Sequence, residues 1–183
     1  MQKEIFNKRI FSIGISTLQL NGLDNDQLCE QIKLCHNGSD DLKRDLGLTN
    51  PHLNNLNDIV LEQCQKILDG ITENLKVKLK RVWGNHNLNS DICIPHTHRD
   101  SFLSAVYYPK STDGKIHFYS PWTDAILSHV PINKTKEFNE YNSSYYELPV
   151  KTGYLVIFPA HLSHFVPISE SERYSIAYDV AVG

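Results

Sequence analysis

A histidine-rich segment lies directly before an apolar run in the second half of the sequence. It reads Pro95-His96-Thr97-His98-Arg99-Asp100, and the apolar run Phe102 to Tyr108 follows it. In an extended chain, residues two apart point to the same side about 6–7 Å apart, so His98 and Asp100 could bind one metal ion together. His96 shares that side and is a competing ligand. The triplet alone is a weak indication, because such spacings arise by chance in many proteins.

A third candidate ligand, His164, follows the apolar run Tyr154 to Phe158 much further along the chain. Two histidines and one carboxylate on one face of a metal leave three coordination positions open. That arrangement is typical of non-haem Fe(II) oxygenases and differs from a closed structural zinc site. Two open positions suit a chelating keto acid, and the third suits oxygen.

The last apolar stretch divides by alternation into a bulky face and a small or polar face. The bulky face holds Tyr174, Ile176, Tyr178, Val180 and Val182, whereas the other holds Arg173, Ser175, Ala177 and Ala181. If the second face lines an interior, the guanidinium of Arg173 needs an anionic partner, since a buried charge must be paired. A bound carboxylate matches the rigid fork of arginine. The alternative is an ordinary ion pair with Glu170, Glu172 or Asp179.

With these residues in place, the sequence resembles the 2-oxoglutarate and Fe(II)-dependent oxygenases, and within them an oxygenase family common in marine cyanobacteria and their phages. The resemblance covers about Val77 to Val180. It rests on Trp83-x-Asn85, on His96-x-His98 leading to Ser104-Ala105-Val106-Tyr107-Tyr108, on Phe158-Pro159 before His164, and on Arg173-x-Ser175-Ile176. Two positions depart from the common pattern without touching a ligand: Ala105 stands where glycine is common, and Ser163 where an aromatic residue is frequent.

The resemblance implies a double-stranded β-helix, or jelly roll, in which His98, Asp100 and His164 bind iron. It implies that Arg173 grips the distal carboxylate of 2-oxoglutarate with help from Ser175. Further contacts to the cosubstrate are implied for Tyr107 or Tyr108 and for Asn85, and His96 is expected in a second shell or beside the substrate. The implied reaction uses O2 to hydroxylate an unactivated C–H bond and releases succinate and CO2.

The rest of the chain must position these groups, and its patterns predict one domain over residues 1–183. Residues 1–76 are expected to form an N-terminal strand (Ile5 to Ile15) and helical support. The first helix is predicted to begin at Asp24 with Gln27, and a longer one follows from an apolar stripe at helical spacing between Leu53 and Leu75.

From residue 77 to residue 183 the period changes to two, which predicts the catalytic core. The expected strands are Val77 onward, Phe102 to Tyr108, Lys115 to Tyr119, Tyr154 to Phe158 and Tyr174 to Val182. Asp113-Gly114 predicts a hairpin, and Thr152-Gly153 predicts the opening of the next strand. The segment Ser120 to Glu147 is expected to be a loop or flap over the site. Short strands with polar turns predict a mainly β antiparallel sandwich or jelly roll, with the N-terminal helices on an outer sheet face.

The composition of the chain restricts the classes of partner that it is expected to bind. The chain has 183 residues and a formal net charge of -3, so generic binding to nucleic acid or to an anionic membrane is disfavoured. No apolar run has the length of a membrane span or a secretory signal, which predicts a cytoplasmic protein, in the host cytoplasm if phage-encoded. The four cysteines are scattered and are expected to be reduced. A small molecule or a peptide side chain is the expected substrate, and self-association stays open.

Two alternatives remain at this stage. One is a cupin-like module that binds a metal or ligand without turnover, and the other is a cupin-type oxygenase or isomerase that does not use 2-oxoglutarate. The pair Arg173-x-Ser175 argues against the binding module, because such a module does not need a clamp for a keto acid. Oxygen-dependent release of succinate would separate all three functions.

Overall fold

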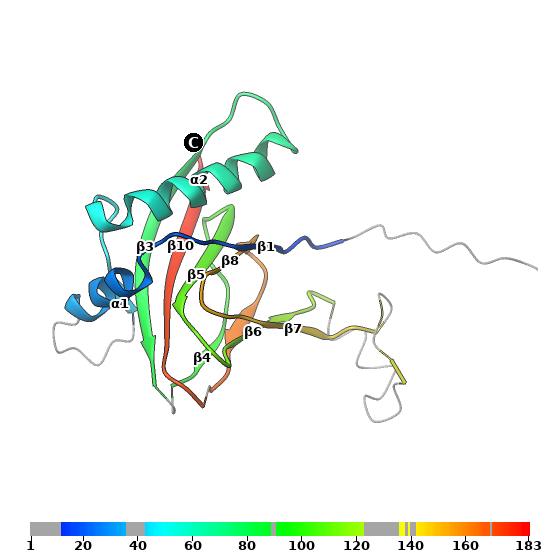
Figure 1. The fold of residues 1–183 in the computed structure, drawn as a ribbon. Helices are drawn as coiled ribbons and strands as arrows, with labels where there is room; N and C mark the ends of the chain where they lie inside the picture. The colour runs from blue at the N-terminus through cyan, green and yellow to red at the C-terminus, as the bar shows by residue number, and fades with distance from the viewer. Residues whose placement is uncertain are drawn as a thin grey trace, which may run out of the picture.

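The fold is seen in a computed structural model that describes residues 12–35, 43–88, 91–122, 136–137, 139, 142–168 and 170–183. The N-terminal part contains β1 (Ser16–Gln19), α1 (Asn25–Leu34), β2 (Lys43–Asp45), a 3-10 turn η1 (Pro51–Leu53) and α2 (Asn54–Asp69). Strands then follow in the order β3 (Val77–Asn87), β4 (Cys93–His96), β5 (Leu103–Lys110), β6 (Lys115–Tyr119), β7 (Tyr145–Pro149), β8 (Tyr154–Pro159), β9 (His164–Val166) and β10 (Arg173–Val182) (Figure 1). Neither α1 nor α2 combines the length and the apolar character that a membrane crossing requires.

Two antiparallel sheets form the body of the molecule. Among the described residues, the larger sheet has the strand order β1-β8-β5-β10-β3-β2 and the smaller has the order β4-β9-β6-β7. Buried side chains of the helices pack with one face of the larger sheet in a first core. A second core fills the space between the sheets and includes Tyr108, Ile116, Phe118 and Phe158. The predicted fold class is confirmed: a mainly β jelly roll carries its helices on the outer face of one sheet (Figure 1).

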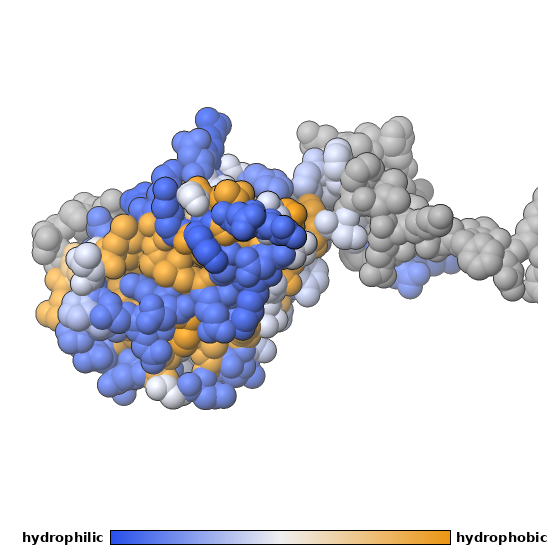
Figure 2. All heavy atoms as spheres, turned by 90° about the horizontal axis from the view of Figure 1, so that it is seen from above, coloured by the Kyte–Doolittle hydropathy of each residue, from blue (hydrophilic) through white to orange (hydrophobic). Residues whose placement is uncertain are grey.

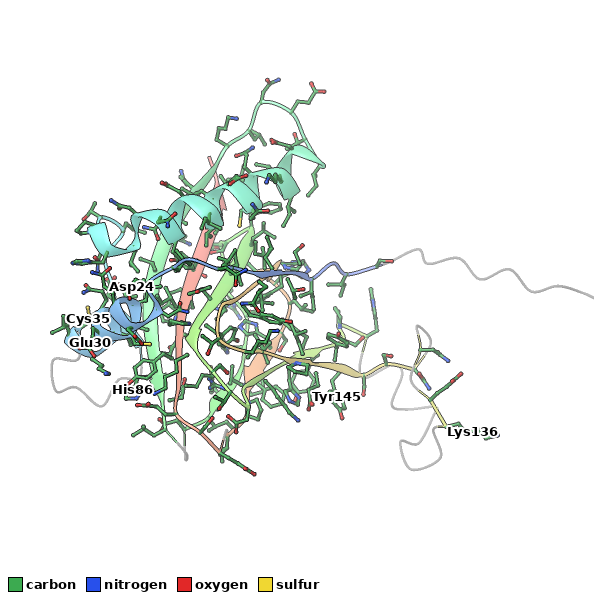
Figure 3. All side chains as sticks on the ribbon, viewed as in Figure 1. Asp24, Glu30, Cys35, His86, Lys136 and Tyr145 are labelled. Carbon is green, nitrogen blue, oxygen red and sulfur yellow. The ribbon has the colours of Figure 1, made fainter. Side chains whose placement is uncertain are left out.

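The helix layer begins where the sequence predicts it. Asp24 caps α1, because its side chain accepts a hydrogen bond from the backbone N–H of Gln27 at 3.0 Å, and Figure 3 labels it at the start of the helix. In α2 the buried stripe is Leu56, Val60, Cys64 and Leu68. The helix ends at Asp69, so the predicted continuation to Leu75 is wrong, and Ile71 beyond that end is 67% exposed.

The strand predictions are confirmed for β3, β5, β6, β8 and β10 within a few residues. The hairpin expected at Asp113-Gly114 is wrong, because β5 and β6 lie in different sheets and the turn carries the chain from one to the other. Four short strands, β2, β4, β7 and β9, were not anticipated. The strand expected over Ile5–Ile15 falls largely on residues outside the described ranges, as does most of the loop expected over Ser120–Glu147, whose end forms β7.

The cysteines of the first core match their expected packing role. Cys29 and Cys64 are buried and unbridged, and burial raises the pKa of their thiols to about 11 and about 12. Figure 2 views the molecule from the side of α2, and this face carries both hydrophilic and hydrophobic residues. The cavity that the candidate site residues line lies between the two sheets.

Candidate active site

Strand pairing brings three histidines together in the smaller sheet. His96 ends β4 and His164 begins β9, and the antiparallel register places these two residues opposite each other. His98 follows β4 by two residues, and its backbone N–H donates to the carbonyl of Ala160 at 2.9 Å, which holds it against the turn between β8 and β9. The three histidines each offer a ligating atom, and these atoms lie within 4.8 Å of one another.

The ring nitrogens have the spacing of metal ligands. The Nε2 atoms of His98 and His164 are 3.3 Å apart. Two neighbouring nitrogens at metal–nitrogen distances of roughly 2.0–2.1 Å would be about 3.0–3.4 Å apart, so both can reach one ion. The rings of His98 and His164 are stacked with their centroids 5.1 Å apart, which keeps both nitrogens on the same side.

The opposite nitrogen, Nδ1, faces an acceptor in all three rings. Carbonyl oxygens only accept, so the proton is assigned to Nδ1 of His96 and His164, and their Nε2 carries the lone pair that a metal needs. In His98 the nearby carboxylate charge favours the proton on the same nitrogen. The three pairs are His96 Nδ1 with Ile94 O at 2.8 Å, His164 Nδ1 with Leu162 O at 2.9 Å, and His98 Nδ1 with Asp179 Oδ1 at 2.8 Å.

The predicted acidic ligand, Asp100, lies outside this cluster. It is exposed in the turn between β4 and β5, with a backbone φ of 62°. Its carbonyl accepts a hydrogen bond from Lys80 Nζ at 3.1 Å. The structure therefore groups His98 and His164 with His96, which the sequence favoured only as a neighbour of the metal, and leaves Asp100 out.

A cavity of about 590 Å³ opens between the two sheets, and the three histidines line it together with Arg173. Arg173 is 2% exposed, and its Nη1 has no hydrogen-bond partner in the described part of the chain. Burial lowers the pKa of its guanidinium, although an arginine stays charged across the physiological range. A buried cation with an unused donor on the wall of a cavity fits an anionic ligand.

Two hydroxyl groups on β5 are also buried on the cavity wall without a hydrogen-bond partner in the described part of the chain. They belong to Ser104 and Tyr108. Burial raises the pKa of Tyr108, against the opposing effect of the nearby Arg173 charge, so its hydroxyl stays protonated and can donate. Tyr107 points the other way, because its hydroxyl donates to Asn25 of α1 at 2.7 Å.

The remaining predicted cosubstrate residues also line the cavity. Asn85 and Ser175 pair across β3 and β10, and the Asn85 amide donates to the Ser175 hydroxyl at 3.2 Å. Together with Arg173 they form a polar strip along the inner face of the larger sheet. The small or polar face of the last strand therefore meets the cavity, while Tyr174 and Ile176 belong to the core under the helices.

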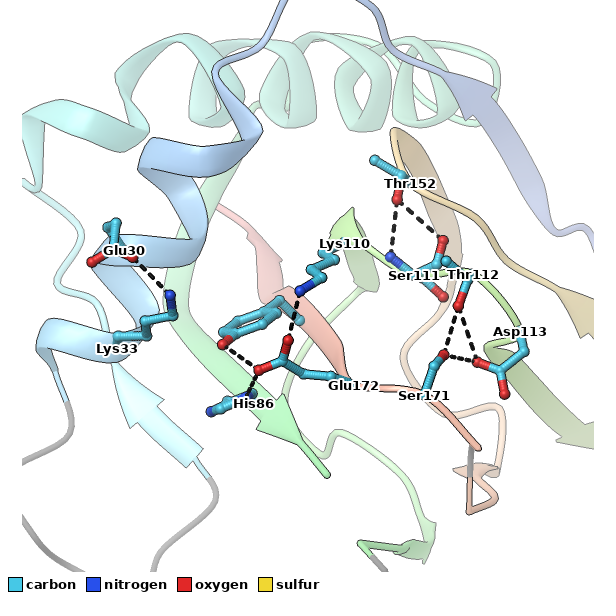
Figure 4. A network of polar contacts seen from close by, with 11 residues as sticks. Glu30, Lys33, His86, Lys110, Ser111, Thr112, Asp113, Thr152, Ser171 and Glu172 are labelled. Atoms are coloured by element: carbon cyan, nitrogen blue, oxygen red, sulfur yellow. Dashed lines mark hydrogen bonds and ion pairs between the residues drawn. The ribbon is translucent and has the colours of Figure 1, made fainter. Parts of the chain in front are cut away.

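The acidic residues near Arg173 are engaged elsewhere. Glu172 faces the helix side, where His86 lies 2.8 Å and Lys110 lies 2.6 Å from its carboxylate, and Tyr174 donates to it at 2.8 Å (Figure 4). These contacts lower the pKa of Glu172 to about 2. Asp179 faces His98. No ion pair joins Arg173 to Glu170, Glu172 or Asp179 in the residues that the structure covers.

The loops on either side of Arg173 are tied together. Asp113 accepts a hydrogen bond from the backbone N–H of Glu170 at 2.8 Å. It also accepts one from the hydroxyl of Ser171 (Figure 4). Gly114 passes so close to Arg173 that an added Cβ would lie 3.1 Å from the arginine Cδ and 2.3 Å from Ser111 Oγ. The glycine is therefore required by a close approach, and the loop around it braces the buried arginine.

Comparisons with known proteins agree with this site. The family model described as "Putative 2OG-Fe(II) oxygenase" matches residues 81–179, which is more than half of the chain. The chain therefore belongs to this family of 2-oxoglutarate and Fe(II)-dependent oxygenases, as the resemblance in the sequence implied. No curated protein matches the sequence.

Solved structures show the same fold at low identity. AviO1 from Streptomyces viridochromogenes Tue57 superposes with a TM-score of 0.65 at 12% identity, covering 92% of this chain and 90% of its own. A prolyl-4-hydroxylase from Pseudomonas putida gives a TM-score of 0.62 at 15% identity, with coverage of 93% and 89%. HygX from Streptomyces hygroscopicus, solved with nickel and 2-oxoglutarate bound, gives 0.62 at 10% identity, with coverage of 92% and 83%. Likeness at this level establishes the jelly-roll fold.

Asp179 was named from the sequence only as a possible ion-pair partner of Arg173, and its contact with His98 was not predicted. It has the same parity on the last strand as Arg173, Ser175 and Ala177, so alternation alone assigns it to the inner face. Parity also separates Tyr108 from Tyr107, because only one of two consecutive strand residues can face the cavity.

Proposed function

We propose that this chain is an Fe(II)- and 2-oxoglutarate-dependent hydroxylase whose iron is held by His96, His98 and His164. One observation carries the proposal: the ligating atoms of three histidines lie within 4.8 Å of one another beside a cavity that also contains Nη1 of Arg173, which is buried without a hydrogen-bond partner among the described residues. The donor set suits Fe(II), because imidazole is a common ligand of that ion and three protein ligands leave positions open. The guanidinium suits the distal carboxylate of 2-oxoglutarate.

Iron and 2-oxoglutarate, when bound, supply the oxidative chemistry: the substrate C–H bond becomes C–OH while O2 is consumed and 2-oxoglutarate becomes succinate and CO2. The residues of the chain bind and orient the cosubstrate. Arg173 fixes one end of the keto acid, and Tyr108 and Ser104 offer it donors from β5. Asn85 orients the Ser175 hydroxyl beside Arg173.

Apolar side chains exclude water from the rest of the cavity. Val106, Ile116 and Val166 line it between the sheets, and Trp83 covers one face of His98 with ring centroids 5.5 Å apart. Ile92 and Ile94 line the cavity and are still 50% and 69% exposed, so they mark its opening. We propose that the substrate presents an apolar C–H group past these two residues, on a small molecule or a peptide side chain.

The direct test is turnover of the purified protein with Fe(II), 2-oxoglutarate and O2, with succinate measured by mass spectrometry. Such enzymes oxidise the cosubstrate slowly without a substrate, so we expect succinate to appear in proportion to protein and to depend on iron. His164→Ala is expected to abolish it. Equal succinate from wild type and His164→Ala would refute the proposal.

A second function is favoured by one observation, the absence of a carboxylate among the three clustered ligands. An all-histidine centre also suits a cupin-type oxygenase that binds its own substrate directly and uses no keto acid. Oxygen consumption with a substrate but without 2-oxoglutarate, and without succinate, would identify that function. The buried Arg173 favours the keto-acid enzyme.

A further inference from the structure

Asp179 is the buried carboxylate closest to the histidine cluster. It lies on β10 with a side chain 13% exposed, and its Oδ1 is 2.8 Å from Nδ1 of His98, whose side chain is 10% exposed. The ring of His98 is packed between Trp83 and His164, at centroid distances of 5.5 and 5.1 Å. The carboxylate therefore meets an imidazole that packing already holds in place.

The acceptors of the three histidines differ in charge. His96 and His164 donate from Nδ1 to neutral backbone carbonyls, whereas Nδ1 of His98 lies at ion-pair distance, 2.8 Å, from a carboxylate oxygen that has no hydrogen-bond partner among the described residues. A carboxylate partner increases the electron donation of an imidazole to a metal more than a neutral carbonyl does. Of the three ligands, His98 is therefore the strongest donor.

The charge balance of the site shows why a carboxylate beside His98 matters. Three neutral imidazoles leave the full charge of a divalent ion uncompensated, and Arg173 adds a second buried positive charge to the same cavity. Arg81, opposite Asp179 across β3, is exposed and stacks on Trp83 with its guanidinium 5.1 Å from the ring. In the described residues the carboxylate on the His98 imidazole is the negative charge placed next to the cluster.

A β-bulge fixes the position of Asp179. The register between β10 and β3 shifts between Asp179 and Val180, so that Lys80 has no opposite residue on β10. Lys80 instead donates to the carbonyl of Asp100 in the turn after His98. Bulges commonly redirect a side chain next to a functional site, and here the bulge lies beside the carboxylate.

We propose that Asp179 is a positioning residue of the metal centre. Its carboxylate lies 2.8 Å from Nδ1 of His98, the ring nitrogen opposite Nε2, and so places one negative charge just outside the coordination sphere. In this centre, it does the electrostatic work that a directly bound carboxylate does in a two-histidine, one-carboxylate site. The inference rests on the proposed function, since it requires the three histidines to bind a metal.

The test isolates the effect of the Asp179 charge. Asp179→Asn keeps an oxygen acceptor for His98 and removes the charge, whereas Asp69→Asn removes the same charge from the end of α2, where the carboxylate accepts a hydrogen bond from Gln65 at 2.6 Å. The probe is Co(II), titrated by its visible absorption and by competition with a chelator. We expect Asp179→Asn to weaken Co(II) binding about 10- to 100-fold and to shift the ligand-field bands, and Asp69→Asn to do neither.

Thermal unfolding of the metal-free proteins shows whether Asp179→Asn is folded. If it is not, Asp179→Glu and Asp179→Gln form a second pair of equal length, and we expect the glutamate variant to bind Co(II) at least 10-fold more tightly than the glutamine variant. Wild-type affinity and spectrum in Asp179→Asn, or equal affinities in the second pair, would overturn the inference alone. Equal Co(II) binding by wild type and His164→Ala would overturn the metal centre itself.

Discussion

Replacing Arg173 by methionine tests the cosubstrate site through two effects of opposite sign. The substitution keeps an unbranched stem and removes a guanidinium that is 2% exposed and whose Nη1 has no partner in the described structure. Hydrogen bonds to charged groups contribute about 1.5–3 kcal/mol each, so two of them to a carboxylate contribute about 3–4 kcal/mol at the lower end. That corresponds to a loss of roughly 10²- to 10³-fold in affinity for 2-oxoglutarate.

The same substitution is expected to stabilise the protein without ligand. Replacing a buried charge by an apolar group of similar size is often stabilising, here by about 1–2 kcal/mol. For a chain of 183 residues, 1 kcal/mol raises the Tm by roughly 2–4 °C, so we expect an increase of about 2–8 °C. The affinity is measured by calorimetry with a redox-inert metal under exclusion of oxygen, and the Tm by circular dichroism without ligand.

A lowered Tm together with unchanged affinity would show that Arg173 supports the fold and does not bind the keto acid. Lys110→Met is the matched control, because its amine is half exposed and pairs with Glu172 on the opposite face of the sheet at 2.6 Å. We expect this control to change the affinity for 2-oxoglutarate less than twofold.

Three further predictions address the site and its surroundings. His96→Ala is expected to weaken Co(II) binding at least 100-fold, and Asp100→Ala less than threefold, as measured by competition with a chelator. The reverse order would show that Asp100, and not His96, binds the metal. Tyr108→Phe is expected to weaken 2-oxoglutarate binding about 2- to 10-fold without loss of Tm. Tyr107→Phe is expected to lower the Tm and leave 2-oxoglutarate binding unchanged. The opposite result would show that Tyr107, and not Tyr108, faces the cavity. Glu172→Gln is expected to cost about 0.5–1 kcal/mol at neutral pH, since its partly exposed contacts are screened. Because folding lowers its pKa from 4.5 to about 2, this contribution is present above pH 4.5 and disappears as the pH falls toward 2, and a pH-independent difference in unfolding free energy would contradict the assignment.

Alternation along single strands predicted much of the site because it is a local property. The two faces of β10 follow from the backbone geometry of one strand, so Arg173 and Ser175 could be placed on the inner face from the sequence alone. The same rule failed at Asp100. It assumes an extended chain, and the chain leaves that conformation in the turn after His98, where Asp100 takes a positive φ.

The pairing of strands with one another could not be predicted from alternation. The turn at Asp113-Gly114 has the residues of a hairpin, yet the strands that flank it pair elsewhere, and the pairing is decided by contacts distant in sequence. The strand β9 has three residues, too few to show a period, and its register against β4 is what brings His96 opposite His164. The sequence therefore names the candidate metal ligands, but it does not show which three of them come together.

The position of β4 at the margin of the smaller sheet has a consequence for the protein without metal. This four-residue strand has a neighbour on one side, β9, and a register irregularity interrupts even that pairing. Short terminal strands open readily, and here the segment that opens carries a ligand. An ion bound between His96 and His164 would link β4 to β9. With metal bound, we expect the amides of β4 to exchange slowly. Without metal, we expect β4 to separate from β9 and its amides to exchange rapidly.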